Sequence, residues 1–267
     1  MKAMIFAAGL GTRLKPLTDS LPKALVPVAG RPLLELVCRK LMYYGVDEAV
    51  VNIHHFAGEI EAWIGSQDWI TSSRDVRDGK MLVHLSDERA LLLETGGAIL
   101  HARRFLEGSG RFLVHNVDIL SDCNLRWLES EVSQDALATL LVSRRRTSRF
   151  FLFEPGTMRL VGWKNESTGE VIMTDPSLDA GDCLAYAFSG IHILSDEVFD
   201  LMDEYVDSKG LPESEAGTRF SIRDFYLWAA SRKPIYGVLS EDLRLLDVGK
   251  PDALTVAEEF IRSADYE

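Results

Sequence analysis

The amino-acid sequence predicts an α/β fold of Rossmann-like type, with a mostly parallel central sheet, helices on both of its faces and a small β-rich insertion. The chain has 267 residues, of which 46% are hydrophobic and 26% are charged, the composition of an ordinary globular protein. In roughly the first 120 residues, short apolar runs alternate with helical patterns, which indicates βαβ units. We expect one domain over residues 1–267, with a first half at 1–120 and a second half at 121–267.

The first half contains four expected strands, each an apolar run typical of a strand buried on both faces. Pro32 opens a helix at its favoured first position, and Gly45 ends it. A short helix follows around Trp63, and another spans Ala98–Leu106. Ligands of parallel sheets lie beyond the carboxyl ends of the strands, so the segments after these strands are the first candidates for a site. The expected strands are Met4–Ala8, Ala49–Ile53, Met81–Leu85 and Phe112–Val117.

The second half is richer in strands, and a Pro-Gly pair between two of them indicates a hairpin. Ser195 is expected to cap a helix over Glu197–Tyr205. Ser221 with Asp224 resembles a helix-start box before Phe225–Ala230. The expected strands are Ala138–Ser143, Phe150–Phe153, Leu160–Trp163, Ala185–Ile193, Ile235–Leu239 and Leu243–Val248, and the expected last helix is Asp252–Ile261.

Charge, hydropathy and cysteine content exclude several classes of protein. The net charge is −12, so a general nucleic-acid or anionic-membrane partner is not expected. No apolar run approaches the roughly 20 residues that span a bilayer, and the first apolar stretch is too short for a signal peptide. Cys38, Cys123 and Cys183 are widely spaced and odd in number. We therefore expect reduced thiols in a cytoplasmic protein.

The charge is unevenly distributed along the chain. Residues 1–40 hold seven basic and two acidic residues, a balance of +5. The other 227 residues hold 22 basic and 39 acidic residues, a balance of −17. A basic segment on an acidic protein indicates a local anion site, although a solvated basic face would give the same count.

A glycine-rich turn follows the first expected strand. The run is Gly9-Leu10-Gly11-Thr12-Arg13, and two such glycines let the backbone turn sharply and form an anion-binding nest of N–H groups. Arg13 can bind two phosphate oxygens through its planar fork, and Lys23 offers a mobile point charge. Leu14 stands where the dinucleotide fingerprint has its third glycine, and no Walker-type Gly-Lys-Ser/Thr follows. The run therefore predicts a polyphosphate site of another kind.

From Ala7 to Val28 the sequence resembles the signature of the nucleotidyltransferases that join a nucleoside triphosphate to a sugar 1-phosphate, approximately A-A-G-x-G-T-R-L-x-P-L-T-x-x-x-P-K-x-L-x-P-V. The match has no gap. Among the members of this family, the sequence is most similar to the single-domain N-acetylmuramate-1-phosphate uridylyltransferase and mannose-1-phosphate guanylyltransferase type. The resemblance recurs, in the family's order, at Leu93–Gly97, Asn116–Asp118, Phe188–Ile191 and Asp247–Gly249.

The resemblance implies a site and a reaction. UTP or GTP would react with a sugar 1-phosphate to release pyrophosphate, with Arg13 and Lys23 as catalytic residues and Asp118 and Asp247 as ligands of Mg²⁺, which prefers oxygen ligands. The first half would bind the nucleotide and the second half the sugar, in a monomer or small homo-oligomer. The resemblance assigns nucleotide binding to Ala7, Ala8, Gly9, Gly11, Thr12, Arg13, Lys23, Glu94, Thr95, Gly96, Gly97 and Asn116, and sugar binding to Asn165, Glu166 and Gly190.

Other interpretations of these residues stay open. An Asp after an apolar strand is by itself more typical of a turn or a helix cap. Gly96 and Gly97 could serve only the packing of a helix start. The family usually has glycine at the position of Val117 and often threonine at that of Lys250. These two departures put the local backbone conformation in question and add a cation near the site.

A run of arginines and a pair of histidines also stand out in the sequence, and two other functions are compatible with it. Arg144–Arg146 with Arg149 are expected to be a solvated strand end, with a sugar-phosphate or partner contact as the second interpretation. His54 and His55 are expected to be a loop pair and not a metal site, since no ligand follows at a suitable spacing. One rival function is a phosphocholine cytidylyltransferase, whose cation would need aromatic residues, and another is a non-catalytic nucleotide-sugar sensor. The available aromatics are Trp163, Trp228 and Tyr186.

Overall fold

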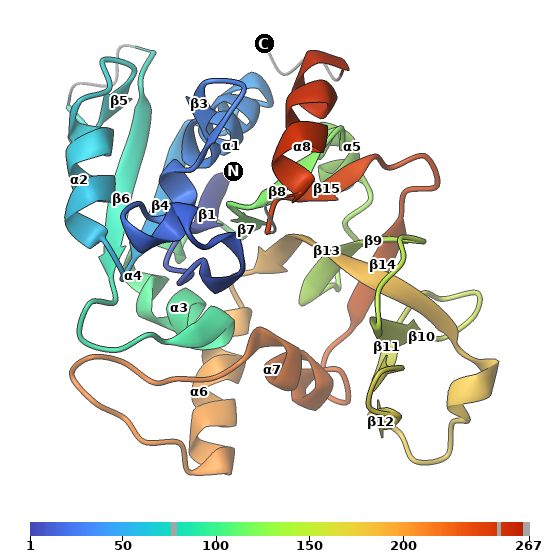
Figure 1. The fold of residues 1–267 in the computed structure, drawn as a ribbon. Coiled ribbons are helices and arrows are strands. Elements are labelled where there is room, and N and C mark those ends of the chain that lie inside the picture. Colours follow the sequence, from blue (N-terminus) through green and yellow to red (C-terminus); the bar gives the residue numbers. More distant parts are fainter. Residues whose placement is uncertain (76–78, 250–251, 264–267) are drawn as a thin grey trace.

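A computed structural model describes residues 1–75, 79–249 and 252–263. Its main sheet runs in the order β12-β11-β10-β13-β7-β1-β4-β6-β5, with β9 beside β13 and β14 beside β9 (Figure 1). The five strands at one end of this order pair in parallel, as the sequence predicts. These strands are β1 (Lys2–Phe6), β4 (Glu48–Ile53), β5 (Ile70–Thr71), β6 (Met81–Asp87) and β7 (Arg111–Asn116).

The rest of the sheet is mainly antiparallel and contains the expected β-rich addition. The long strand β13 (Leu184–Ser195) runs antiparallel to β7, β9 and β10. β10, β11 and β12 continue as antiparallel neighbours, and the Pro-Gly hairpin joins the first two. The remaining strands are β8 (Ile119–Ser121), β9 (Ala138–Ser143), β10 (Arg149–Phe153), β11 (Leu160–Asn165), β12 (Glu170–Met173), β14 (Ile235–Leu239) and β15 (Leu245–Asp247), with a small ribbon of β2 (Pro27–Val28) and β3 (Arg31–Pro32).

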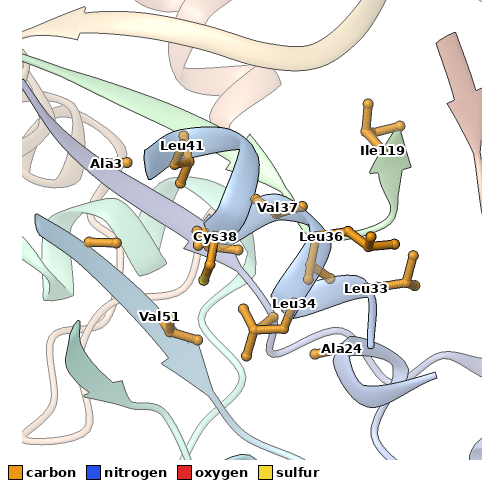
Figure 2. Close-up of a cluster of buried hydrophobic side chains, with 14 of the residues drawn as sticks. Ala3, Ala24, Leu33, Leu34, Leu36, Val37, Cys38, Leu41, Val51 and Ile119 are labelled. Carbon is orange, nitrogen blue, oxygen red and sulfur yellow. The ribbon is translucent and has the colours of Figure 1, made fainter. Parts of the chain in front are cut away.

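Helices cover both faces of the sheet, because successive strand residues point to opposite sides. Ala3 and Ile5 of β1 enter one hydrophobic core, and Met4 enters the other. Figure 2 shows the first core, where Leu34, Val37, Cys38 and Leu41 of α1 lie beside the strands that carry Ala3 and Val51. This core includes residues of α1 (Leu33–Tyr43), α2 (Ala57–Gly65), α5 (Leu125–Ser130) and α8 (Asp252–Ser263), and the second includes residues of α3 (Glu94–His101), α4 (Arg103–Leu106), α6 (Val198–Lys209) and α7 (Ile222–Ala229).

The structure corrects several expected boundaries. β1 ends at Phe6 and not at Ala8, because the N–H groups of Ala7 and Ala8 donate to the Asn52 side chain and no longer to a neighbouring strand. The helix expected over Ala98–Leu106 begins earlier, at Glu94, and is interrupted at Ala102. The first long helix begins at Leu33, with the preceding proline as its N-cap.

The two expected helix caps have different outcomes. Ser221 is the N-cap of α7, and its side chain accepts a hydrogen bond from Arg223 N at 3.2 Å. The cap expected at Ser195 is wrong, since this residue ends β13 and Glu197 is the N-cap of α6. The Ser195 hydroxyl instead accepts from Glu197 N at 3.3 Å in the turn between strand and helix.

Two of the excluded classes can be compared with the structure. Within the ranges that the structure describes, no helix is both long and apolar enough to cross a membrane. All three cysteines are unpaired, with Cys38 and Cys123 buried and Cys183 partly exposed.

Candidate active site

The candidate residues gather at the edge where the parallel strands end. β1 leads into the glycine-rich turn, β6 into the segment before α3, and β7 into Asp118. Parallel neighbours bring all these carboxyl ends to one side of the sheet. The topology therefore brings together the three segments that the sequence singles out after its strands.

The turn after β1 has the tight geometry that its glycines predict. Gly11 has a φ of +64°, a conformation that favours glycine. A Cβ at this position would lie 2.8 Å from Thr18 Cγ2 and 3.2 Å from Lys23 Cβ. The Thr18 hydroxyl donates to Gly11 O at 2.8 Å, which closes the turn. Gly9 and Thr12 stay exposed on it.

Each candidate catalytic cation is paired with a candidate metal ligand. Lys23 Nζ contacts Asp118 Oδ2, and the two side chains are only 13% and 15% exposed. Arg13 Nη2 lies 3.7 Å from Asp247 Oδ1 in a more open pair. These two ion pairs join residues that lie up to 234 positions apart in the sequence, and we call the four residues the charged cluster.

A two-stranded ribbon holds the two aspartates side by side. β8 begins directly after Asp118, β15 ends at Asp247, and the two strands pair with Asp247 opposite Ile119. Val248 N donates to Asp118 O at 2.8 Å. Gly249 has no side chain, which leaves room for Arg13 and Asp247. A Cβ at this position would lie 2.6 Å from Asp247 Oδ1 and 2.4 Å from Arg13 Nη2.

The carboxylates fit a hard divalent cation. Asp247 Oδ1 is shielded from solvent and has no hydrogen-bond partner in the described part of the chain, although Arg13 lies nearby. The described residues include no group of three or more His, Cys, Asp or Glu side chains that could enclose a metal. A cation here would therefore take two protein carboxylates and complete its shell from phosphate and water, the usual situation of Mg²⁺.

Two cavities open at this edge, and Glu94 lines both. The smaller has a volume of about 240 Å³, and its lining includes Gly9, Lys23 and Asp118. The larger has a volume of about 1170 Å³ and includes Arg13 and Asp247. The other lining residues of the smaller cavity are Phe6, Ala8, Asn52, Glu88, Leu92, Glu94, Thr95, Asn116 and Val117.

The helix start at Glu94–Gly97 is present, and its two glycines are closely packed. The N–H groups of Gly96 and Gly97 donate to Phe220 O at 2.9 and 3.1 Å. A Cβ at Gly96 would lie 2.4 Å from the Phe220 ring, and one at Gly97 would lie 2.0 Å from Thr218 O. The two glycines therefore serve the close packing of α3 against residues 218–220, and their N–H groups are already used.

The first two residues of this helix start line the cavity instead. Glu94 has a φ of +60°, unusual for a residue with a side chain, and lies 2.7 Å from Arg219 Nη2. The Thr95 hydroxyl accepts from Ile222 N at 3.0 Å, which ties α3 to the start of α7.

The expected sugar-binding residues lie in two places. Gly190 of β13 has a φ of +74°, and a Cβ there would lie 2.8 Å from Asn116 Nδ2, so it adjoins a residue of the smaller cavity. Asn165 and Glu166 lie at the turn after β11. The Asn165 side chain accepts from Ser167 N at 3.1 Å, and Glu166 pairs with Lys164 at 2.9 Å. These contacts are those of a turn.

The larger cavity contains residues that the sequence analysis placed elsewhere. Arg145, which is half-buried, and Arg149, which is exposed, line it. Arg144, paired with Glu241, and Arg146 are exposed, as expected of a solvated strand end. Arg145 Nη2 donates to Phe188 O at 3.0 Å. Alternate residues of a strand face the same side, and Arg149 and Phe151 of β10 both line the cavity. This alternation could have indicated where Arg149 lies. The remaining lining residues are Thr147, Ser148, Phe151, Trp163, Phe188, Ser221, Arg223 and Asp224.

The two departures from the family pattern and the histidine pair can also be located. Val117 is buried and is not among the described non-glycine residues with positive φ, so the glycine that the family has there is not required by this backbone. Lys250 lies outside the described residues. His54 Nδ1 lies 2.6 Å from Glu88 O, and His55 is exposed, as expected of a loop pair.

This α/β sheet brings a basic glycine turn and paired carboxylates to one edge, which is the architecture of a nucleotide-binding protein. Comparison with known proteins gives the family of the chain. Residues 2–264 match the family model described as nucleotidyl transferase. The chain belongs to this family and is a nucleotidyltransferase.

Individual relatives extend this result over the whole chain. The N-acetylmuramate alpha-1-phosphate uridylyltransferase of Caulobacter vibrioides is 33% identical over 98% of this chain and 97% of its own. The mannose-1-phosphate guanylyltransferase 1 of Arabidopsis thaliana is 30% identical over 76% of this chain and 52% of its own. A solved UDP-glucose pyrophosphorylase in complex with UDP-glucose has the same fold, with a TM-score of 0.72 at 17% identity over 98% of both chains.

Proposed function

We propose that this chain transfers the nucleotidyl group of UTP or GTP to a sugar 1-phosphate and releases pyrophosphate. The observation that carries the proposal is the cluster in which Arg13 and Lys23 meet Asp118 and Asp247 beside an exposed glycine turn. The uridylyltransferase and guanylyltransferase relatives support both the nucleotide and an acceptor of the N-acetylmuramate or mannose 1-phosphate type.

The chemistry asks the protein mainly for positioning and charge neutralisation. A phosphate oxygen of the acceptor attacks the α-phosphorus in line, and pyrophosphate leaves. Gly9, Gly11 and Thr12 line the turn for the phosphates, Arg13 neutralises the leaving β- and γ-phosphates, and Lys23 neutralises charge at the α-phosphate. No covalent enzyme intermediate is required.

Asp118 and Asp247 are the residues that would hold Mg²⁺. When bound, the ion neutralises phosphate charge and so favours attack at phosphorus. In the present arrangement each carboxylate faces a cation, and Lys23 must leave Asp118 to reach the substrate phosphate. The same side chain then neutralises a carboxylate in the free protein and a phosphate in the complex.

The two cavities suggest a division of the substrates. The smaller cavity, with Glu94, Thr95 and Asn116 in its wall, is assigned to the nucleoside. The larger one, lined by Arg145, Arg149 and Trp163, is assigned to the acceptor. Gly190, Asn165 and Glu166 keep the sugar-binding role that the family resemblance implies. Residues 1–120 then supply most of the nucleotide site and residues 121–267 most of the acceptor site, within one domain.

The aromatic residues argue against phosphocholine as the acceptor. A quaternary ammonium group needs free aromatic faces. An arginine guanidinium instead lies over each of the three candidate rings. Arg223 lies 4.6 Å from the ring centroid of Trp163. The corresponding distances are 5.3 Å for Arg144 and Tyr186 and 3.7 Å for Arg232 and Trp228. Arg145 and Arg149 in the same cavity would also repel a cation. The second rival, a non-catalytic sensor, would not need the charged cluster that is present.

We place this activity in the cytoplasm, where the three unpaired cysteines would stay reduced. The test of the function is a grid of five nucleoside triphosphates against sugar 1-phosphates and phosphocholine with Mg²⁺, followed by pyrophosphate release. We expect release with UTP or GTP and an N-acetylmuramate or mannose type of acceptor. Release only with phosphocholine would establish the first rival, and nucleotide binding without release in any combination would favour the sensor.

A further inference from the structure

Two buried polar side chains without an assigned role join the two loops of the smaller cavity. Asn52 lies near the end of β4, and Glu88 directly follows β6; they are 3% and 1% exposed. Asn52 Nδ2 donates to Glu88 Oε1 at 2.7 Å. Both residues line the cavity assigned to the nucleoside. We call this pair the Asn52–Glu88 bridge.

One end of the bridge holds the start of the glycine turn. Asn52 Oδ1 accepts from Ala7 N at 2.7 Å and from Ala8 N at 3.2 Å. The chain leaves β1 at these two residues, so their N–H groups no longer have a neighbouring strand to bond to. The Asn52 side chain provides the hydrogen-bond acceptor instead. The direction in which the turn leaves the sheet therefore depends on Asn52.

The other end of the bridge holds the segment before α3. Glu88 Oε2 accepts from Leu93 N at 3.2 Å, one residue before the helix begins at Glu94. Its backbone carbonyl also contacts the His54 ring, with Nδ1 at 2.6 Å. Burial raises the pKa of the Glu88 carboxyl, while the bonds from Asn52 and Leu93 stabilise its charged form.

We propose that Asn52 and Glu88 are positioning residues that set the spacing between the phosphate turn and the loop before α3, and thereby the affinity for the nucleoside triphosphate. The inference rests on the proposed function, because it takes the smaller cavity as the nucleotide site. Neither side chain is assigned a contact with the reacting groups, so their effect passes through Ala7, Ala8 and Leu93. A buried network whose hydrogen bonds are satisfied specifies one geometry and loses it when one member changes.

The two side chains can be exchanged with no change in charge or in the number of hydrogen bonds. With Asn52→Asp and Glu88→Gln together, the new amide donates to the new carboxylate, which still accepts from Ala7 N and Ala8 N. The amide oxygen still accepts from Leu93 N. Asn52→Asp alone sets two carboxylates face to face, and Glu88→Gln alone turns an amide N–H₂ toward a donor.

The experiment compares both single variants, the exchanged pair and the wild type in steady-state kinetics and in calorimetric binding of UTP and GTP with Mg²⁺. We expect each single variant to weaken nucleotide binding and raise its KM by roughly 10- to 100-fold, the effect of one buried unpaired group. The KM for the acceptor should stay unchanged, and the exchanged pair should recover most of the nucleotide affinity.

Asn124→Asp is the matched control, because it makes the same chemical change at a helix cap elsewhere. Asn124 Oδ1 accepts from Arg126 N and Trp127 N at the start of α5, and aspartate caps a helix equally well. This variant should keep the wild-type constants. Thermal unfolding of every variant gives the folded fraction at the assay temperature.

The proposal is overturned if the single variants bind nucleotide as the wild type does, if both KM values rise together, or if the exchanged pair shows no recovery. Failure of the proposed function gives a different result. In that case the wild type releases no pyrophosphate in any combination, and the dissociation constants alone decide whether the bridge positions the nucleotide loops. A wild type that binds no triphosphate overturns both proposals.

Discussion

At the scale of single residues, Lys23 has two roles to satisfy. It neutralises Asp118 in the free protein, where both side chains are largely buried, and it is assigned to the α-phosphate in the reaction. A long, flexible side chain with a point charge can serve both partners in turn, which a rigid guanidinium would do less easily. Its pairing with a candidate metal ligand is a consequence of the fold that the sequence motif does not show.

Lys23→Ala should lower turnover by roughly 10²- to 10³-fold, since one fixed charge at the transition state contributes that much. The protein should remain folded, although Asp118 loses its partner and some stability with it. Lys15→Ala is the control, because Lys15 lies on the same segment but is exposed and pairs with Asp19 at 2.9 Å. Pyrophosphate release and circular dichroism measure the two effects. Turnover near that of the wild type would remove the role assigned to Lys23.

The candidate site residues differ in how far the sequence could predict them. Arg13, Lys23, Asp118 and Asp247 could be selected because the motif resemblance specifies their identity and order. The structure pairs Lys23 with Asp118 and Arg13 with Asp247. Asn52 could not, because nothing in an apolar strand tells which polar residue faces a neighbouring turn. Its partners lie 44 and 45 positions away, so the relation exists only after β1 and β4 pair.

At the scale of elements, the strands were more predictable than the helix ends. Apolar runs and their alternation depend on local sequence, and β14 has the expected bounds of Ile235–Leu239. The helix start at Glu94–Gly97 is confirmed, whereas the helix expected over Ala98–Leu106 is interrupted at Ala102. Gly96 and Gly97 are fitted to residues 218–220, far along the chain. β15 lies within the expected strand Leu243–Val248, but β8 has only three residues and carries too little periodicity to be recognised. The pairing of the two strands, which holds the aspartates, is therefore seen only in the structure.

The junction of β7 and β13 should make the protein sensitive to acid. His192 is fully buried, its Nδ1 lies 3.0 Å from the Tyr226 hydroxyl, and burial lowers its pKa to about 3, with His115 beside it adding to the effect. In the unfolded chain a histidine titrates near 6.5. Between these values the unfolded state binds the extra proton, so the free energy of unfolding falls as the pH is lowered from 6.5 toward 3.

Urea unfolding between pH 7 and pH 5 measures this effect. His192→Asn, which does not titrate, should reduce the slope of the free energy of unfolding against pH by up to about 1.4 kcal/mol per pH unit. The carboxylates contribute equally to both proteins, so the difference between the slopes isolates the histidine. Equal slopes in the two proteins would show that His192 is not buried in its neutral form.

At the scale of the whole molecule, the fold brings the basic and acidic parts of the sequence together. The basic first 40 residues supply Arg13 and Lys23, and the acidic remainder supplies Asp118 and Asp247, so the fold joins the two kinds of charge at one sheet edge. The parallel direction of these strands could be anticipated from the βαβ pattern, whereas their order could not. The position of the antiparallel strands, and with it the arginine-lined cavity, depends on long-range pairing of β13 with β7 and β10, which no local pattern records.

The same charge arrangement makes nucleotide binding depend on metal. A triphosphate brought to this edge meets two carboxylates as well as two cations, and without Mg²⁺ it would repel Asp118 and Asp247. We therefore expect UTP or GTP to raise the melting temperature only when Mg²⁺ is present. At a hundredfold excess over Kd the gain is about 2.7 kcal/mol, or roughly 5–10 °C for a chain of this length.

A double variant, Asp118→Asn with Asp247→Asn, tests whether the dependence on Mg²⁺ comes from repulsion by the two aspartates or from a general effect of salt. The double variant should be stabilised by the nucleotide in EDTA as well as in Mg²⁺, because the repulsion is gone, and it should have lost turnover with the metal ligands. Differential scanning fluorimetry of both proteins, with and without EDTA at constant ionic strength, gives the four values required. If the nucleotide stabilises the wild type equally in EDTA, the two aspartates do not share a metal ion with the triphosphate, and the roles assigned to both must be withdrawn.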